Sequence, residues 1–438
     1  NMDLARPFRQ HARRLLRAPS FTAVSIGTLA LGIGATIAIF AVVDGVLLEP
    51  LPYPQADRLI GVWHTAPGLD FEEVNQGPGT HMTYAAENRV FEQIGLWDDS
   101  RATVTGIGEP EEIASMRVTY GTLPMLGARL VRGRLFTADD DAPGAPLTTI
   151  VGWGYWQRRL AGDPAVVGRT ITVDGRPREI IGVLPREFRL LDHEPDVYLP
   201  FQLDPAEAFV GGFSYQSIAR LRPGVTIEQA NADIARMIPI AVERYPGPLT
   251  LQMLREARFG PNVRPLARDV IGDVDDVLWV LLGTVAIVLL IACANVANLF
   301  LVRAEGRYRE VAVRTALGAS RGRIAREFLA EGGVLALFGG ALGVALAAGG
   351  LQLLRALGPE GLPRLHAVAI DGSVLAVAFL LSVAAGGFLG LVPILRHGAG
   401  NVAGALREGG RGGSAGRERH RARSVLVVAQ LALALVLL

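Results

Sequence analysis

The stretch RAEGRYREVAVRTALGASRGRIAREFLAE, residues 303–331, lies between two long runs that carry no charged side chain. It contains seven arginines and four glutamates, whereas residues 277–302 before it and residues 332–354 after it contain none. A charge-free run of this length crosses the hydrocarbon core of about 30 Å as a helix. Basic residues beside such runs mark the side that stays in the cytoplasm. The stretch is therefore predicted to be a cytoplasmic elbow between two membrane helices.

Inside the elbow, the residues predict two helices that meet at a corner. Gly318 is placed to end the first helix in a left-handed conformation, and Ser320 to cap the first turn of the second. Arg307, Glu310 and Arg314 are three and four residues apart and share one face of the first helix. Such a face suits an acidic partner. The alternative is a basic loop whose only role is to set the topology.

The segment around the elbow, residues 291–332, resembles the MacB/FtsX-like permeases of ABC transporters, whose pattern is R-x-x-E-[IV]-A-[VI]-R-x-A-L-G-A-S and then a glutamate. The matching positions are Arg307, Glu310, Val311, Ala312, Val313, Arg314, Ala316, Leu317, Gly318, Ala319, Ser320 and Glu331. In that family the elbow docks on the ATPase subunit and passes its closure to the membrane helices. The resemblance therefore implies that the ATPase contacts here are Arg307, Arg309, Glu310, Val313, Arg314, Leu317, Gly318, Ala319 and Ser320.

The expected fold class is an α-helical membrane protein with a large α+β domain inserted between the first and second helices. Four complete spans and the start of a fifth are predicted, at residues 18–43, 277–302, 332–354, 372–395 and 424–438. The segments expected in the cytoplasm are residues 1–17, 303–331 and 396–423. Those expected outside are residues 44–276 and 355–371.

The distribution of charge supports this topology. The insert, residues 44–276, has 22 arginines and 33 acidic residues, a net charge of −11, while the rest of the chain has a net charge of +12. An acidic domain outside and basic segments inside are what the positive-inside rule predicts. A cleaved signal peptide is disfavoured, because the first apolar run is longer than the 7 to 15 residues typical of one.

Local patterns within the insert indicate α+β structure. Residues 169–183 predict a hairpin with its turn at Asp174-Gly175, and residues 196–199 and 217–221 predict short strands. Residues 226–243 predict a helix that opens with a capping box formed by Thr226 and Gln229. Residues 118–140 and 154–188 resemble the periplasmic core domain of MacB-like proteins, on the positions Gly127, Gly133, Arg134, Phe136, Trp156, Asp163, Pro164, Gly168, Gly175, Gly182, Val183 and Phe188.

Composition excludes several chemistries. All 43 basic residues are arginine, so neither a P-loop, nor a Schiff-base lysine, nor an S-x-x-K hydrolase motif is present. ATP hydrolysis, with its ATP and magnesium, is accordingly expected on a separate chain, and no cofactor on this one. The single cysteine, Cys293, and seven scattered histidines give no metal-ligand spacing. The run Asp139, Asp140, Asp141 lacks the alternating ligands of a calcium loop and indicates a solvated turn.

Small and polar residues in the spans are candidates for helix packing. Gly339 and Gly343, like Gly386 and Gly390, have the small-xxx-small spacing that lets helices approach closely. Asn295 and Asn298 are three residues apart, and polar groups at hydrocarbon depth normally bond to a neighbouring helix. Substrate contact is the alternative interpretation of the asparagine pair.

The leading interpretation is the permease subunit of a MacB/FtsX-like ABC transporter in the bacterial inner membrane, with its large domain in the periplasm. The expected partners are an ABC ATPase, membrane lipid, a periplasmic adaptor, and a second permease copy or a second repeat of this chain, but no nucleic acid. The resemblance to tandem-duplicated permeases suggests that the sequence is the N-terminal half of one. The alternatives are a membrane-anchored receptor that binds a ligand outside and a membrane-anchored periplasmic enzyme. Co-purification of a soluble ATPase would distinguish the transporter from both.

Overall fold

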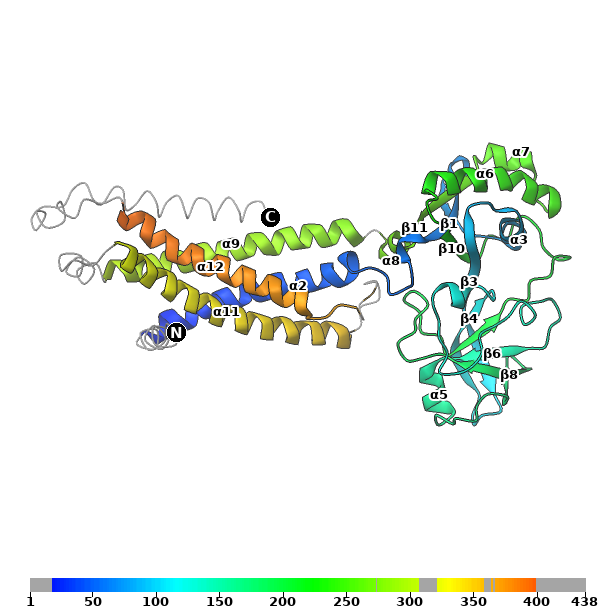
Figure 1. Ribbon diagram of the computed structural model, residues 1–438, viewed down its shortest axis with the longest axis horizontal. Coiled ribbons are helices and arrows are strands. Elements are labelled where there is room, and N and C mark those ends of the chain that lie inside the picture. Colours follow the sequence, from blue (N-terminus) through cyan, green and yellow to red (C-terminus); the bar gives the residue numbers. More distant parts are fainter. Residues whose placement is uncertain (1–17, 273, 307–320, 358–363, 365–366, 399–438) are drawn as a thin grey trace, which may run out of the picture. The chain divides into compact units, whose positions relative to one another are not determined.

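The computed structural model describes residues 18–272, 274–306, 321–357, 364 and 367–398. The chain divides into two compact units, each of which is shown in Figure 1. One unit, the helical bundle, comprises Asn1–Glu49 and Asp273–Leu438, and the other, the inserted domain, comprises Pro50–Gly272. The elements of the helical bundle are α2 (Pro19–Val43), the π-helix η1 (Asp44–Leu48), α9 (Val274–Gly306), α11 (Arg321–Leu357) and α12 (Gly372–Gly398).

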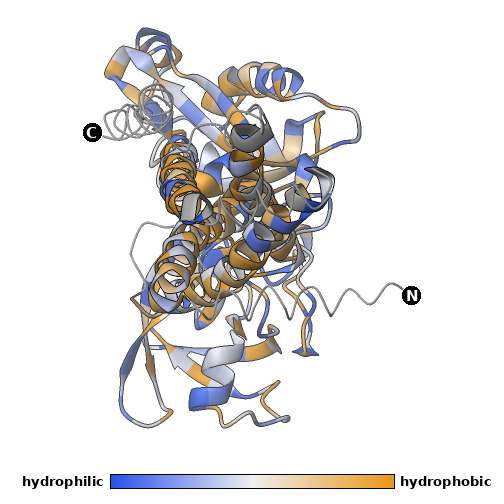
Figure 2. Ribbon diagram, turned by 90° about the vertical axis from the view of Figure 1, so that its left-hand side faces the viewer, coloured by the Kyte–Doolittle hydropathy of each residue, from blue (hydrophilic) through white to orange (hydrophobic). Residues whose placement is uncertain are grey.

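Among the described residues, four helices are long and apolar enough to cross a membrane. Their candidate spans are Pro19–Leu48, Val274–Arg303, Ala325–Leu357 and Gly372–Ile394. Hydrophobic residues run along the helices of this unit, as Figure 2 shows. Because the backbone polar groups of a helix are bonded internally, such segments meet the requirement for crossing lipid. The predicted fold class is confirmed in its four apolar helices and in the mixed-sheet domain between the first and the second. The start of a fifth span, predicted at residues 424–438, lies outside the described residues.

α2 is the central helix of the bundle. Its residues Leu29, Ile33 and Ile37 are completely buried and form part of a core shared with α9, α11 and α12. In the most apolar window of α2, 56% of the residues are buried, whereas the corresponding figure for α9 is 22%. α2 is thus enclosed by its neighbours, and α9 presents most of its surface outward.

The inserted domain is built on a sheet with the strand order β11-β1-β10-β3-β4-β9-β6-β8-β5, to which β2 and β7 are added. Most neighbours are antiparallel, but the pairs β4–β9 and β6–β8 are parallel. The strands are β1 (Leu59–Ala66), β2 (Phe71–Val74), β3 (Phe91–Thr105), β4 (Glu111–Val118), β5 (Arg132–Gly133), β6 (Thr148–Val151), β7 (Thr170–Val173), β8 (Arg176–Val183), β9 (Val197–Pro200), β10 (Gln216–Leu221) and β11 (Gly260–Pro265). The long strand β3 joins two halves of this sheet, since it pairs with β10 near its start and with β4 farther along.

Helices cover the two halves separately. The half with β1, β10 and β11 packs under α3 (Pro78–Glu87), α6 (Ile227–Arg244) and α7 (Leu251–Glu256) around Tyr84, Ile234 and Met237. The half with β6, β8 and β9 packs on α5 (Trp153–Arg159) around Tyr155 and Val183. The remaining helices are α4 (Thr122–Met125) and α8 (Leu266–Ile271), with the short 3-10 helices η2 (Ala56–Arg58) and η3 (Pro67–Leu69).

Three local predictions in this domain are confirmed by the structure. β7 and β8 form the hairpin, with Asp174 and Gly175 both at positive φ in its turn. The Thr226 hydroxyl accepts a hydrogen bond from the amide of Gln229, and the Gln229 side chain accepts one from the amide of Thr226, which completes the capping box. The two short strands are β9 and β10.

Candidate coupling site

All nine residues proposed from sequence to contact an ATPase fall within residues 307–320, outside the described part of the chain. The predicted corner at Gly318 and Ser320 lies there too. The structure describes the two flanks of the elbow: α9 through Gly306, and α11 from Arg321 onward. The described residues nearest to the predicted site are therefore the end of α9 and the start of α11.

α11 is a single helix across the predicted boundary between the elbow and the third span. Its 37 residues run from Arg321 to Leu357, so the basic turns that carry Arg323 and Arg326 continue directly into the apolar span. Both arginines are exposed, while Glu331, which heads the apolar part, is only 2% exposed. The basic turns and the apolar span therefore belong to one continuous helix, with no break at the predicted boundary.

An aromatic cluster joins three helices where the elbow begins. The Phe21 ring of α2 stacks on Phe300 of α9 at 6.3 Å between centroids, and Phe300 meets Phe328 of α11 edge to face at 6.2 Å. The Arg303 guanidinium lies over the Phe21 ring, with Cζ 4.6 Å from its centroid. Stacking and cation–π contacts contribute about 0.5–2 kcal/mol each when they are shielded from water. We call Phe21, Phe300, Arg303 and Phe328 the aromatic junction.

The aromatic junction was not anticipated from sequence. Phe300 and Arg303 are three apart on α9, a spacing that puts them on one side of the helix. Phe328 comes from the far side of the elbow, and Phe21 from near the start of the chain. The one sequence feature that points to the junction is an arginine, Arg303, one helical turn after an aromatic residue, Phe300, at the end of a span.

The predicted packing glycines lie at close helix contacts. A Cβ atom on Gly343 of α11 would be 3.0 Å from the amide nitrogen of Gly34 in α2, and one on Gly339 would be 2.7 Å from Leu29 Cβ. On α12, a Cβ on Gly386 would be 2.9 Å from Gly333 Cα, and one on Gly390 would be 2.6 Å from Leu329 Cα. A side chain at Gly339, Gly386 or Gly390 would force the helices to shift, and at Gly343 it would make a tight contact with the backbone of α2.

The two asparagines of α9 do not share one environment. Asn295 lies on the exposed side of the helix, and Asn298 is half-buried.

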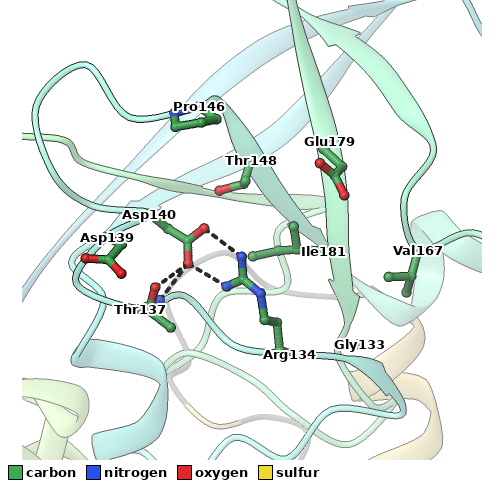
Figure 3. Close-up of a pocket in the computed structure, with 10 residues that line it drawn as sticks. All are labelled: Gly133, Arg134, Thr137, Asp139, Asp140, Pro146, Thr148, Val167, Glu179 and Ile181. Atoms are coloured by element: carbon green, nitrogen blue, oxygen red, sulfur yellow. Dashed lines mark hydrogen bonds and ion pairs between the residues drawn. The ribbon is translucent and has the colours of Figure 1, made fainter.

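In the inserted domain, a pocket of about 650 Å³ lies beside β5, β6 and β8 and includes Arg134, Asp140, Thr148 and Glu179 in its lining (Figure 3). The Arg134 guanidinium is bonded by two nitrogens to Asp140, at 2.5 and 2.9 Å, and Asp140 also accepts bonds from the amide and hydroxyl of Thr137. The bond from Arg134 lowers the pKa of Asp140 to about 2. The positive charge of Arg134 in this pocket is thus already balanced by the carboxylate of Asp140.

This geometry corrects the interpretation of residues 139–141 as a solvated turn. The Asp140 side chain is 8% exposed in its bond to Arg134. Asp141 accepts the backbone amides of Tyr120 and Gln202 at 3.0 and 2.8 Å, and burial raises the pKa of its carboxyl group. Of the three aspartates, only Asp139 is exposed. Through these bonds the run connects to the backbone at Tyr120 and Gln202 and to the side chain of Arg134. Among the described residues, no group of His, Cys, Asp and Glu is suited to bind a metal.

A buried polar cluster lies under α3. His64 Nε2 is 2.7 Å from the Tyr84 hydroxyl, and His64 Nδ1 is 3.3 Å from the carbonyl of Asn75. These contacts are satisfied when Nδ1–H donates to the carbonyl and the Tyr84 hydroxyl donates to Nε2, which requires a neutral ring. Burial lowers the pKa of His64 and of nearby His81 to about 4.

Two family models match the chain over these two units. The MacB-like periplasmic core domain matches residues 22–237, and the FtsX-like permease C-terminal domain matches residues 282–401. The chain belongs to the MacB/FtsX-like permeases of ABC transporters. It is therefore a multi-pass protein of the inner membrane, and the inserted domain is periplasmic.

Named relatives agree with this family. The chain is 28% identical over 298 residues to the Uncharacterized ABC transporter permease YknZ of Bacillus subtilis (strain 168), a match that covers 68% of this chain and 67% of the relative. It is 29% identical over 272 residues to the Macrolide export ATP-binding/permease protein MacB of Rhodopseudomonas palustris (strain BisB18), covering 61% of this chain and 39% of that protein. The chain thus spans between about two fifths and two thirds of the length of these two relatives.

A solved structure also matches. The crystal structure of the periplasmic region of MacB from Actinobacillus actinomycetemcomitans covers 52% of this chain and 93% of its own, with 11% identity and a TM-score of 0.35.

Proposed function

We propose that this MacB/FtsX-like permease transmits the ATP-driven motion of a separate ATPase subunit across the inner membrane to its periplasmic domain, which then acts in the export of a substrate. The observation that carries the proposal is the continuity of α11 from Arg321 to Leu357. A partner that moves the basic end of α11 in the cytoplasm would move the outer end as well. ATP and magnesium would be held by that partner.

The aromatic junction supports the same route. Because Phe21, Phe300 and Phe328 belong to three different helices, a motion of α11 at its cytoplasmic end would be shared with α2 and α9. α2 and α9 are the two helices that lead into and out of the periplasmic domain. The apolar residues on the outward face of α9, such as Val280 and Leu290, would face membrane lipid. A second permease copy or repeat is a candidate partner of the bundle. A periplasmic adaptor is a further candidate partner.

The test is the ATPase activity of a co-expressed ATPase, reconstituted in lipid with the wild-type permease or with Glu310→Arg. Reversing a charge at a desolvated contact costs several kcal/mol, whereas the same change on a solvated surface costs a few tenths. We expect E310R to reduce stimulation of the ATPase at least about tenfold. The matched control is Glu187→Arg, the same reversal at an exposed position of the periplasmic domain.

If E310R stimulates the ATPase as well as E187R does, the elbow is a topogenic loop and the proposal fails. If no ATPase co-purifies with the wild-type chain while a soluble ligand binds the periplasmic domain, the receptor alternative replaces it.

A further inference from the structure

α2 does not end as an ordinary α-helix. Its last turn widens into the π-helix Asp44–Leu48, in which the Glu49 amide donates to the Asp44 carbonyl at 2.8 Å. The next residue, Pro50, begins the periplasmic domain. Short π-helical turns occur often at functional positions of helices, and a helix end leaves carbonyl groups that need partners from elsewhere.

One side chain supplies those partners. Arg364, from the segment between α11 and α12, donates through Nη1 to the carbonyls of Val46 at 3.1 Å and Glu49 at 2.7 Å. Its residue is 5% exposed, and its φ of +56° lies in the left-handed region that side-chain-bearing residues occupy only where their surroundings hold them. The guanidinium thus bonds both the π-helical turn and the residue where it ends.

The same segment touches the π-helix at a second point. A Cβ atom on Gly45 would be 2.9 Å from Cα of Val368, so the two backbones are in direct contact. Val368 is 1% exposed and belongs to the core of the bundle. The carbonyl of Val368 accepts a hydrogen bond from Arg355 near the end of α11.

A third contact comes from the start of α12. The Ser373 hydroxyl bonds to the carboxylate of Asp44 at 2.7 Å, and Asp371 accepts the amide of Val374 at 2.9 Å in the first turn. The π-helical end of α2 is therefore attached to α11 through Val368 and Arg355, and to α12 through Ser373. All of these contacts lie within the helical bundle.

We propose that Arg364 is a positioning residue of the transmission path, because it fastens the π-helical end of α2 to the segment between α11 and α12. Movement of α11 and α12 would then be passed to the π-helical end of α2, directly before the chain enters the periplasmic domain at Pro50. This inference rests on the proposed function and adds a second, outer coupling point to the cytoplasmic elbow.

The experiment uses the full chain, the co-expressed ATPase and lipid nanodiscs, in a Cys293→Ala background. Spin labels at Arg176→Cys in the periplasmic domain and Leu342→Cys on the exposed side of α11 report the distance between the two units, without nucleotide and with ATP trapped on the ATPase. Hydrogen exchange of the amides of residues 45–49 reports the π-helical segment directly. The matched control is Arg101→Ala, which removes an exposed arginine of the periplasmic domain.

We expect Arg364→Ala to raise exchange of the residue 45–49 amides about tenfold, since two buried charge-assisted bonds are lost. The nucleotide-dependent change in distance should shrink at least about fivefold, while stimulation of the ATPase stays at the level of R101A. Arg364→Lys should fall between, because an ammonium group lacks the planar fork of donors. In the linked chain, the spin labels at positions 176 and 342 are attached to p-acetylphenylalanine instead of cysteine. Joining Asp44→Cys to Ser373→Cys with a short bis-methanethiosulfonate linker should then restore the distance change in R364A, which a general loss of stability would not permit.

The proposal is overturned if R364A keeps the wild-type distance change, or if the linked R364A chain does not regain it. Should R364A fail to fold, R364K carries the comparison with the wild-type chain. A wild-type chain that does not stimulate the ATPase contradicts the proposed function instead, and the exchange rates of residues 45–49 still show whether Arg364 holds the segment.

Discussion

Gly34 of α2 and Gly343 of α11 are in direct backbone contact: a Cβ atom on Gly34 would lie 2.8 Å from the carbonyl oxygen of Gly343. Ala30, one turn before Gly34, also faces this contact through its carbonyl oxygen, 3.1 Å from the Cβ position of Gly343. In lipid, where water exclusion does not drive helices together, such close packing and the interhelical bonds it allows supply much of the attraction. The contact therefore holds the central helix of the bundle against the helix that leaves the elbow.

The first prediction concerns this contact. Gly34→Val should separate α2 from α11 and lower the free energy of unfolding by about 1–3 kcal/mol, the usual cost of overpacking. Gly27→Val is the matched control, because a Cβ at Gly27 meets no atom within 4 Å. The measurement is thermal unfolding of the full chain in detergent. Equal melting temperatures for the two variants would show that the contact does not stabilise the bundle.

The second prediction concerns topology. In a Cys293→Ala background, a single cysteine at position 176 should react with an impermeant thiol reagent added outside, and one at position 314 should react only after the membrane is opened. The physical reason is the positive-inside rule applied to the acidic insert and the basic elbow. The reverse labelling pattern would overturn the assignment of residues 303–331 to the cytoplasm.

The parts of the fold that could be predicted are those that local sequence decides. A long run without charged residues identifies a membrane helix. The pair Asp174-Gly175 determines a hairpin turn, and Thr226 with Gln229 determines a helix cap, each within a few residues. The glycines of α11 and α12 follow the same logic, since their spacing alone marks a face on which helices can approach.

Long-range pairing in the sheet could not be predicted from local pattern. β1 pairs with β10 and β11, strands about 150 to 200 residues away, and the register of such pairs depends on contacts that no short window contains. β3 has 15 residues and carries Asp98, Asp99, Ser100 and Arg101 in its middle. From sequence, this polar run predicts a loop between two short strands and not one continuous strand.

The same limit applies to the candidate site. Phe21 meets Phe300 across nearly 280 residues of sequence, and Arg364 reaches carbonyls more than 300 residues earlier. A lone arginine in a segment poor in charge gives no sign of its acceptors. Only the packing of the four helices brings these groups together.

The third prediction separates the three aspartates of the run 139–141. Asp140→Asn should lower the free energy of unfolding by about 1–2 kcal/mol near neutral pH, because Arg134 loses its charged partner and the carboxylate no longer holds Thr137. Asp139→Asn changes an exposed side chain and serves as the control. Urea unfolding, followed by tryptophan fluorescence, measures both. A D140N chain as stable as D139N would show that the ion pair contributes nothing.

The pH dependence of that ion pair has a defined sign. The pKa of Asp140 is lowered from its ordinary value of 3.8 to about 2 by its bond to Arg134. The stabilisation is therefore present above pH 4 and is lost as the pH falls through 2. Between pH 4 and pH 7 the pair should contribute a constant amount, so any change of stability in that range has another source.

The fourth prediction concerns the two buried histidines, which are one such source. Burial lowers the pKa of His64 and His81 from 6.5 to about 4 in the folded protein. Between those values the unfolded chain binds protons that the folded chain does not, so stability falls as the pH drops from 6.5 to 4. Each histidine should account for about 3 kcal/mol over this range, at roughly 1.4 kcal/mol per pKa unit.

The measurement is urea unfolding of the full chain in detergent at pH 7.5, 6.5, 5.5 and 4.5. Tryptophan fluorescence follows the periplasmic domain, because four of the five tryptophans, Trp63, Trp97, Trp153 and Trp156, lie in it. His81→Leu removes one titrating ring and should halve the loss of stability between pH 6.5 and 4.5. Because His81 Nδ1 has no hydrogen-bond partner among the described residues, this variant should cost less than about 1 kcal/mol at pH 7.5, where both rings are neutral. A wild-type chain whose stability is flat from pH 7.5 to 4.5 would contradict the burial of both rings, and an H81L chain with the wild-type slope would assign the whole effect to His64.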